Sequence, residues 1–176
     1  MELYLYECGS ALGKKQISDT AYSLLRKIFA EKFSVTAPEI LRSENGKPYF
    51  DGLPCRFSVS HSGSFILIGI DDEEIGVDIQ LHKSLKPNSR LFSEGMLAEF
   101  GYYDAWTLRE SAYKLSGEGS LRSMEFVRTA DRILSPRNSI NCRLYHIRDG
   151  ISIAAASFGN NFPDDIIILT ENAIST

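Results

Sequence analysis

The chain has 176 residues, of which 43% are hydrophobic and 24% are charged, an ordinary composition for a folded domain. Its formal net charge of −4 argues against general nucleic-acid binding, which requires a basic surface. No segment approaches the roughly 18 consecutive apolar residues of a membrane span, and the first ten residues lack the basic start of a signal peptide. We therefore expect a cytoplasmic protein that binds neither membranes nor nucleic acid.

The first part of the chain predicts a strand, a helix and then three strands. Apolar residues at helical spacing define the helix, and Ser18 or Asp19 is the candidate N-cap. The last three strands are separated by short polar turns, and the middle one is apolar on both faces, so both faces should be covered. The predicted elements are a strand over 2–8, a helix over 18–33, and strands over 56–60, 64–71 and 75–80.

The second part of the chain predicts helices followed by strands. The second helix should end at Gly117, a residue type that is common just after a helix C-terminus. The predicted elements are helices over 91–100 and 102–117, and strands over 124–129, 142–147, 151–157 and 165–170. This order favours an α+β fold of two similar α/β halves, residues 1–74 and 75–176, over alternating β-α units.

Three cysteines, Cys8, Cys55 and Cys142, lie far apart, and none belongs to a C-x-x-C pair. An odd number at these spacings does not suit a disulfide framework or a zinc site. We expect reduced, buried thiols.

Asp78 is an isolated carboxylate between Val77 and Ile79 on an apolar strand. Carboxylates are rarely buried without a partner, so Asp78 either faces water at an edge, forms a buried salt bridge or binds a metal ion. Magnesium prefers oxygen ligands and often takes one or two carboxylates together with substrate phosphates. Glu110 can complete such a pair if the strand end meets the helix.

On that helix, Trp106, Glu110 and Lys114 are spaced by four, with Arg109 and Tyr113 on the same stripe. Taken alone, this pattern is more typical of an exposed Glu–Lys pair, worth about 0.3–0.5 kcal/mol.

The segment Ser60-His61-Ser62 does not predict a nucleophilic serine. Adjacent strand residues point to opposite faces, and the G-x-S-x-G elbow is absent. A hydroxyl and an imidazole at a strand end can instead donate hydrogen bonds to phosphate, although a histidine considered alone is more often structural. The triplet Gly46-Lys47-Pro48 is no phosphate-binding P-loop.

Four motifs in order nevertheless form a pattern: GKP at 46–48, FSVSHSG at 57–63, IGVDI at 75–79 and WTLRESAYKLSGEG at 106–119. This pattern resembles the 4′-phosphopantetheinyl transferase superfamily, in which GKP, (F/N)xSHS, GxDxE and WxxKExxxK follow one another. It looks most like the larger, single-chain (surfactin-synthetase-activating) type. The resemblance spans about residues 18–168.

The resemblance implies an enzyme that transfers the 4′-phosphopantetheine arm of coenzyme A to a serine of an apo acyl or peptidyl carrier protein. The reaction requires Mg²⁺ and releases adenosine 3′,5′-bisphosphate. The implied fold is a pseudo-dimer of two similar halves with coenzyme A in the cleft between them, and the chain is then expected to be a monomer.

The resemblance also implies roles for individual residues. Asp78 and Glu110 would hold the metal ion, and Glu110 would accept the proton of the carrier serine. Lys114 would contact the pyrophosphate and steady the charge on the leaving phosphate. The residues implied to bind coenzyme A are Asp78 and Lys114, Ser60 and His61 at its phosphates, Gly46, Lys47 and Pro48 along its nucleotide, and Ser23 near the 3′-phosphate.

Three positions depart from the family pattern. Gln80 replaces the glutamate of GxDxE, which should weaken metal affinity. Arg109 replaces the lysine before the helix glutamate, which keeps the charge and changes its geometry. Tyr22 stands where a basic residue is often found on the first helix, and Lys14 and Lys15 are the nearby basic residues.

Two further readings share these residues. One is a non-catalytic protein that binds coenzyme A or a carrier on the same fold, which Gln80 and Tyr22 favour. The other is a metal-dependent phosphoesterase that needs no protein acceptor.

Overall fold

The computed structural model of the chain describes residues 1–10, 12–34, 39–84, 88–117, 121–137 and 139–170. Within these residues, no helix is long and apolar enough to span a membrane. The expected α+β class is confirmed. The elements are β1 (Glu2–Glu7), α1 (Lys14–Phe33), β2 (Ile40–Arg42), β3 (Pro48–Phe50), β4 (Arg56–Ser62), β5 (Phe65–Asp71), β6 (Ile75–Leu81), η1 (Ser89–Leu91), α2 (Glu94–Ser116), η2 (Leu121–Ser123), β7 (Val127–Arg128), β8 (Ile133–Ser135), β9 (Ile140–Tyr145), β10 (Ile151–Ser157) and β11 (Ile167–Leu169).

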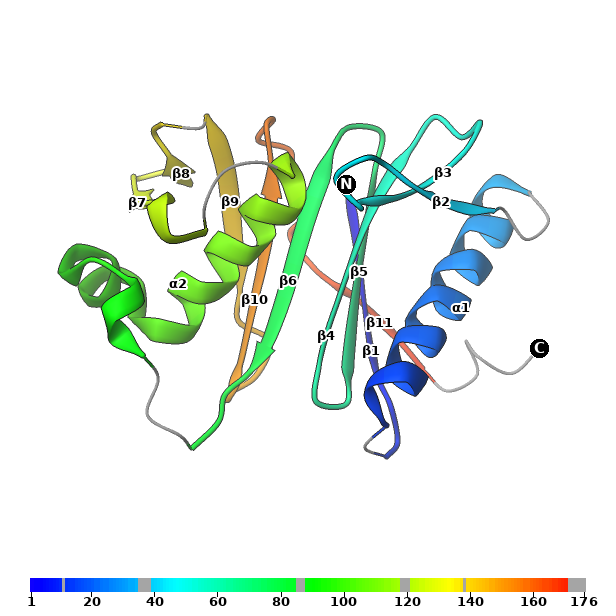
Figure 1. Cartoon of the computed structure of the whole chain (residues 1–176), viewed down its shortest axis with the longest axis horizontal. Helices are drawn as coiled ribbons and strands as arrows, with labels where there is room; N and C mark the ends of the chain where they lie inside the picture. Colours follow the sequence, from blue (N-terminus) through cyan, green and yellow to red (C-terminus); the bar gives the residue numbers. More distant parts are fainter. Residues whose placement is uncertain (11, 35–38, 85–87, 118–120, 138, 171–176) are drawn as a thin grey trace.

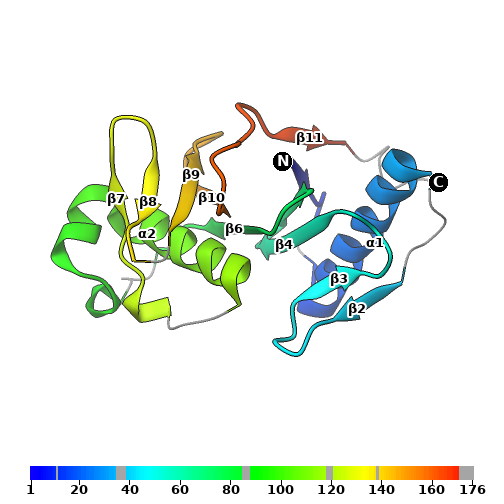
Figure 2. The same cartoon turned by 90° about the horizontal axis from the view of Figure 1, so that it is seen from above.

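Two sheets stand side by side, each covered on its outer face by one long helix (Figure 1). The first sheet has the strand order β11-β1-β5-β4 and is covered by α1. The second has the order β6-β10-β9-β8-β7 and is covered by α2. Seen from above, β4 and β6 are the strands that meet in the middle, and the short β2-β3 hairpin lies beside β4 (Figure 2).

The two sheets pack against each other through an apolar core of their own, which includes Leu3, Leu67, Val77, Ile79 and Ile153. β5 therefore has both faces covered, as the sequence predicts: Phe65 and Leu67 face this central core, while Ile66, Ile68 and Ile70 face α1. A strand buried on both faces requires apolar residues at every position, which explains its uninterrupted apolar run.

The first helix begins four residues earlier than predicted. Gly13 is the N-cap, and its N–H donates to Oε1 of Gln16 at 3.0 Å, so neither Ser18 nor Asp19 caps the helix. The prediction was wrong because it relied on side-chain caps, whereas here a backbone N–H is satisfied by a glutamine in the first turn. The predicted apolar stripe is buried at Ala21, Leu24, Leu25, Ile28 and Phe29 and half-buried at Phe33, its last predicted member, and Ile17 extends it into the first turn.

The second helix ends at Gly117 as predicted: this residue, at φ 65°, donates its N–H to the Tyr113 carbonyl. Its start at Ser93, whose Oγ accepts the N–H of Met96, lies inside the predicted segment 91–100, and this cap was not predicted. Gly101, at φ 70°, separates the two predicted helical segments by a kink. The end at Gly117 places the last turn of α2 beside the cleft described below.

After α2, β10 coincides with the predicted strand 151–157, and β9 has the predicted length but begins two residues earlier. β11 is shorter than predicted, and of the predicted strand 124–129 only Val127–Arg128 pairs, with β8, a strand that was not predicted. β11 runs parallel to β1 and so joins the sheet of the first half. The division into 1–74 and 75–176 stays a prediction. All three cysteines are buried and free, as expected.

Candidate functional site

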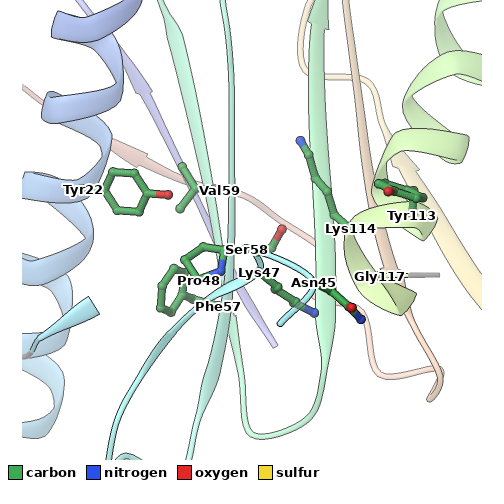
Figure 3. Close-up of a pocket in the computed structure, with 11 residues that line it drawn as sticks. Tyr22, Asn45, Lys47, Pro48, Phe57, Ser58, Val59, Tyr113, Lys114 and Gly117 are labelled. Atoms are coloured by element: carbon green, nitrogen blue, oxygen red, sulfur yellow. The ribbon is translucent and has the colours of Figure 1, made fainter. Parts of the chain in front are cut away.

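A cavity of about 240 Å³ lies between the two halves and collects residues from four separate segments. Tyr22 reaches it from α1, and Tyr113 and Lys114 reach it from α2 on the other side (Figure 3). The lining residues are Tyr22, Asn45, Gly46, Lys47, Pro48, Phe57, Ser58, Val59, Tyr113, Lys114 and Gly117. The GKP triplet and the end of the WxxKExxxK helix thus face one space.

Asp78, Ser60 and Lys114 form a hydrogen-bonded group at the junction of β6, β4 and α2. Ser60 Oγ donates to Asp78 Oδ1 at 2.7 Å, and Lys114 Nζ donates to the same oxygen at 2.7 Å. Lys114 Nζ also donates to Ser60 Oγ at 2.9 Å. The isolated carboxylate on the apolar strand is therefore 5% exposed and ion-paired with a lysine 36 positions away in the sequence.

The second oxygen of Asp78 has no partner. Of the buried side-chain oxygen and nitrogen atoms in the described residues, only Oδ2 of Asp78 lacks a hydrogen-bond partner. Buried polar atoms are nearly always satisfied, so an unpaired carboxylate oxygen marks a place where a donor or a cation completes the group. This observation fits a metal ligand better than a purely structural salt bridge.

Glu110 supplies a second carboxylate close enough to Asp78 to feel its charge. Burial raises the pKa of Glu110, the negative charge of Asp78 raises it further, and Lys114 opposes both effects. Two carboxylates close enough for the charge of one to raise the pKa of the other are also suited to share a cation. No cluster of three or more His, Cys, Asp or Glu side chains occurs among the described residues, so any metal ion here would rest on this pair and on substrate oxygens.

The serines of FSVSHS connect the two sheets. The Oγ atoms of Ser58, Ser60 and Ser62 accept the backbone N–H groups of Val77, Ile79 and Leu81, at 3.0, 3.3 and 3.0 Å. β4 and β6 are therefore joined by side-chain hydroxyls instead of a backbone ladder. The alternation of the three serines in the sequence is the signal for this role, which was not predicted for any of them.

The hydroxyl of Ser60 is fully used in this arrangement. It donates to Asp78 and accepts from both Lys114 and the Ile79 N–H, and a hydroxyl offers one donor and two acceptor sites. To donate to a phosphate, as expected, the Ser60 hydroxyl would have to give up its hydrogen bond to Asp78. The role stays a prediction.

His61 lies on the other face of β4. It follows Phe57 and Val59, which line the cavity, at the strand period of two, so it extends the same face. The His61 side chain is exposed. Partial desolvation lowers its pKa, and Lys114 lowers it further, so the imidazole is neutral at neutral pH.

Lys47 lines the cavity, but its ammonium is held at the edge. Nζ pairs with Glu74 at 2.5 Å and also donates to the carbonyls of Leu115 and Ile75, at 3.1 and 3.3 Å. These contacts tie the β2-β3 hairpin to the start of β6 and the end of α2. Gly46, at φ 78°, makes the turn that presents Lys47 and Pro48.

The comparisons with known proteins agree with this geometry. The chain is 27% identical to 4′-phosphopantetheinyl transferase ffp of Bacillus subtilis over 174 residues, which cover 86% of the chain and 78% of the relative. It is 25% identical to 4′-phosphopantetheinyl transferase Sfp of Bacillus subtilis strain 168, over 84% of the chain and 76% of the relative. Over most of its length, the chain is therefore similar to 4′-phosphopantetheinyl transferases. A shorter match, at 34% identity over 46% of the chain, is with 4′-phosphopantetheinyl transferase AcpT of Salmonella typhi. No family model matches the chain.

One expectation for the second helix is wrong. Arg109 does not share the half-buried stripe of Glu110 and Lys114, because it is 2% exposed and its guanidinium points into the core beneath α2. Its nitrogen atoms donate to the carbonyls of Met124 and Leu91, at 2.7 and 2.5 Å, and to Glu125 at 2.8 Å. Arg109 therefore fixes the segment after α2 and is not available to a partner.

The other two departures from the family pattern are Tyr22 and Gln80. Tyr22 lines the cavity, whereas Lys14 and Lys15 are exposed in the first turn of α1 and Ser23 is exposed outside the lining. Gln80 follows Asp78 on the same face of β6, and its Nε2 donates to the Leu81 carbonyl.

Proposed function

We propose that this protein transfers the 4′-phosphopantetheine arm of coenzyme A to a serine of an apo acyl or peptidyl carrier protein, with Mg²⁺ as cofactor. The observation that carries this proposal is the convergence of Ser60, Asp78 and Lys114 within hydrogen-bonding distance, beside a cavity lined by residues 46–48. These residues come from four separate family motifs. The similarity of the chain to 4′-phosphopantetheinyl transferases supports the same reaction.

The proposed binding site uses the cavity for coenzyme A and the Asp78–Glu110 pair for the metal ion. The unpaired oxygen of Asp78 and the raised pKa of Glu110 support this assignment. A magnesium ion held there supplies charge neutralisation at the pyrophosphate. Tyr22, Pro48, Phe57 and Val59 give the cavity apolar walls suited to the nucleotide and the pantetheine arm.

In the proposed reaction, the carrier serine hydroxyl attacks the phosphorus atom that carries the pantetheine arm. A new serine O–P bond forms, and the P–O bond to the adenosine bisphosphate breaks. Glu110 accepts the serine proton as the general base. Lys114 stabilises the charge that develops on the leaving phosphate.

The proposal also covers the oligomeric state of the protein, its location in the cell and the approach of the carrier protein. One chain supplies both halves of the cavity, so we propose that it acts as a monomer in the cytoplasm. The carrier protein would approach from the side of α2 where Glu110 and the exposed ring of Tyr113 lie.

The test is the intact mass of an apo acyl carrier protein and of an apo peptidyl carrier protein after incubation with this protein, coenzyme A and Mg²⁺. A mass gain equal to the phosphopantetheine arm, lost when Mg²⁺ is omitted, is expected. No gain on any of several carriers, with coenzyme A bound and intact, would contradict the proposal and favour a non-catalytic binding protein. Breakdown of coenzyme A without a carrier would indicate a phosphoesterase.

A further inference from the structure

Lys114 holds one of the two carboxylate oxygens that a metal ion at Asp78 would use. Its ammonium contacts Asp78 Oδ1 at 2.7 Å, Ser60 Oγ at 2.9 Å and the Val77 carbonyl at 3.2 Å. An ammonium group has three donors, so this set of acceptors satisfies it completely. In the absence of ligands, Lys114 is thus an internal counter-ion of Asp78.

The placement of Lys114 also controls access to Asp78. Lys114 lines the cavity, whereas Asp78 does not, and the exposed fractions of the two side chains are 29% and 7%. A cation that enters from the cavity therefore meets the lysine before the carboxylate. Because like charges repel strongly where water is scarce, the metal ion and the ammonium cannot both sit at Asp78 without cost.

We propose that Lys114 keeps the metal site closed until an anionic substrate draws its ammonium away from Asp78. The inference rests on the proposed function and adds an order of binding, in which the anionic substrate precedes the metal ion. A pyrophosphate in the cavity offers Lys114 a new acceptor, and the flexible lysine stem allows the ammonium to move to it. Asp78 Oδ1 then becomes free beside the already unpaired Oδ2.

The consequence is a positive coupling between the two ligands. The metal ion binds weakly to the free protein and more tightly once coenzyme A is present, and by linkage coenzyme A binds more tightly when the metal ion is present. Part of this coupling arises because metal and phosphate contact each other in any such site. The part that depends on Lys114 should disappear when its charge is removed.

Direct metal binding tests the inference without any turnover. Mn²⁺ is titrated into the full-length protein and free Mn²⁺ is followed by electron paramagnetic resonance, without carrier protein. Without coenzyme A, Lys114→Met should bind Mn²⁺ about tenfold more tightly than the wild type, a typical size for a coupling. Coenzyme A should raise the Mn²⁺ affinity of both proteins. The factor by which it does so should be about tenfold smaller in Lys114→Met than in the wild type.

Matched variants identify the cause. Lys114→Gln, which keeps hydrogen-bonding capacity without charge, should behave like Lys114→Met, and Lys114→Arg, which keeps the charge, should bind Mn²⁺ as weakly as the wild type. Asp78→Asn, alone or combined with Lys114→Met, should abolish Mn²⁺ binding. This loss would place the Mn²⁺ site at Asp78. Thermal unfolding shows which variants are folded. If Lys114→Met is not folded, Lys114→Gln takes its place as the neutral variant.

The inference is overturned if Mn²⁺ affinity is unchanged or weaker in both neutral variants while Asp78→Asn still removes the binding. That result leaves the proposed function intact if the wild type modifies a carrier protein in the mass assay. Conversely, tighter Mn²⁺ binding in the neutral variants with no carrier modification by the wild type supports the closed metal site and contradicts the transferase.

Discussion

Gly76 on β6 lies directly against the backbone of Ser111 on α2. A Cβ atom at Gly76 would be 1.9 Å from the Ser111 carbonyl oxygen and 2.5 Å from the Leu115 nitrogen. Only a residue without a side chain permits this approach. The close approach sets the distance between β6, which carries Asp78, and α2, which carries Glu110 and Lys114.

Gly76→Ala should therefore disrupt both stability and the site. The added methyl group meets backbone atoms that cannot rotate away, so we expect a loss of about 3 kcal/mol in the free energy of unfolding, the upper end for overpacking. Urea unfolding measures this loss. Gly95→Ala is the matched control, because Gly95 is also a glycine of the α2 region with open space around its Cβ position. Equal stability of the two variants would contradict the proposed packing role.

Ser60→Ala should cost more than the equivalent change at Ser62. Ser60 bonds to two charged groups and one N–H, and hydrogen bonds to charged groups contribute about 1.5–3 kcal/mol. Ser62 Oγ accepts the Leu81 N–H at 3.0 Å, a neutral bond worth about 1 kcal/mol. Chemical denaturation of both variants compares these losses, and a greater loss at Ser62 would argue against the central place of Ser60.

Glu110 should make stability depend on pH in a defined direction. Its pKa in the folded chain is raised above the ordinary value of 4.5, so the folded state binds more protons than the unfolded state between these two values. The free energy of unfolding contributed by Glu110 is then highest below 4.5 and falls as pH rises through the folded pKa. We expect Glu110→Gln to be more stable than the wild type at neutral pH, while carrier modification is lost.

The measurement for Glu110 is urea unfolding of both proteins across the acidic to neutral range. The stability advantage of Glu110→Gln should shrink as the pH falls toward 4.5. An advantage that stays constant with pH would show that it arises from packing and not from the charge of Glu110.

Gln80→Glu should lower the Mg²⁺ concentration needed for half-maximal carrier modification. Gln80 lies two residues after Asp78 on the same face of β6, so a third carboxylate there would add charge at the proposed metal site. Carrier modification followed by intact mass, at a series of Mg²⁺ concentrations, measures the effect. An unchanged Mg²⁺ requirement would show that this position does not reach the metal ion.

The sequence by itself determined most of the long helices and strands and the chemical candidates. The doubly apolar run of β5, the helical stripe of α1 and the end of α2 at Gly117 follow from local periodicity and backbone preference, which are encoded within a few neighbouring residues. The order of four short motifs also predicted the family. The start of α1 was missed because its cap depends on the Gln16 side chain rather than on a serine or aspartate.

Only the tertiary structure decided the partners of these candidates. Asp78, Ser60 and Lys114 are brought together by the meeting of β4, β6 and α2, and no local pattern specifies which lysine reaches a carboxylate 36 residues away. Arg109 and Glu110 are adjacent in the sequence, but the helix turns the first into the core and the second toward Asp78. Side-chain direction and burial arise from packing between distant segments, and this packing separates a structural arginine from a site glutamate.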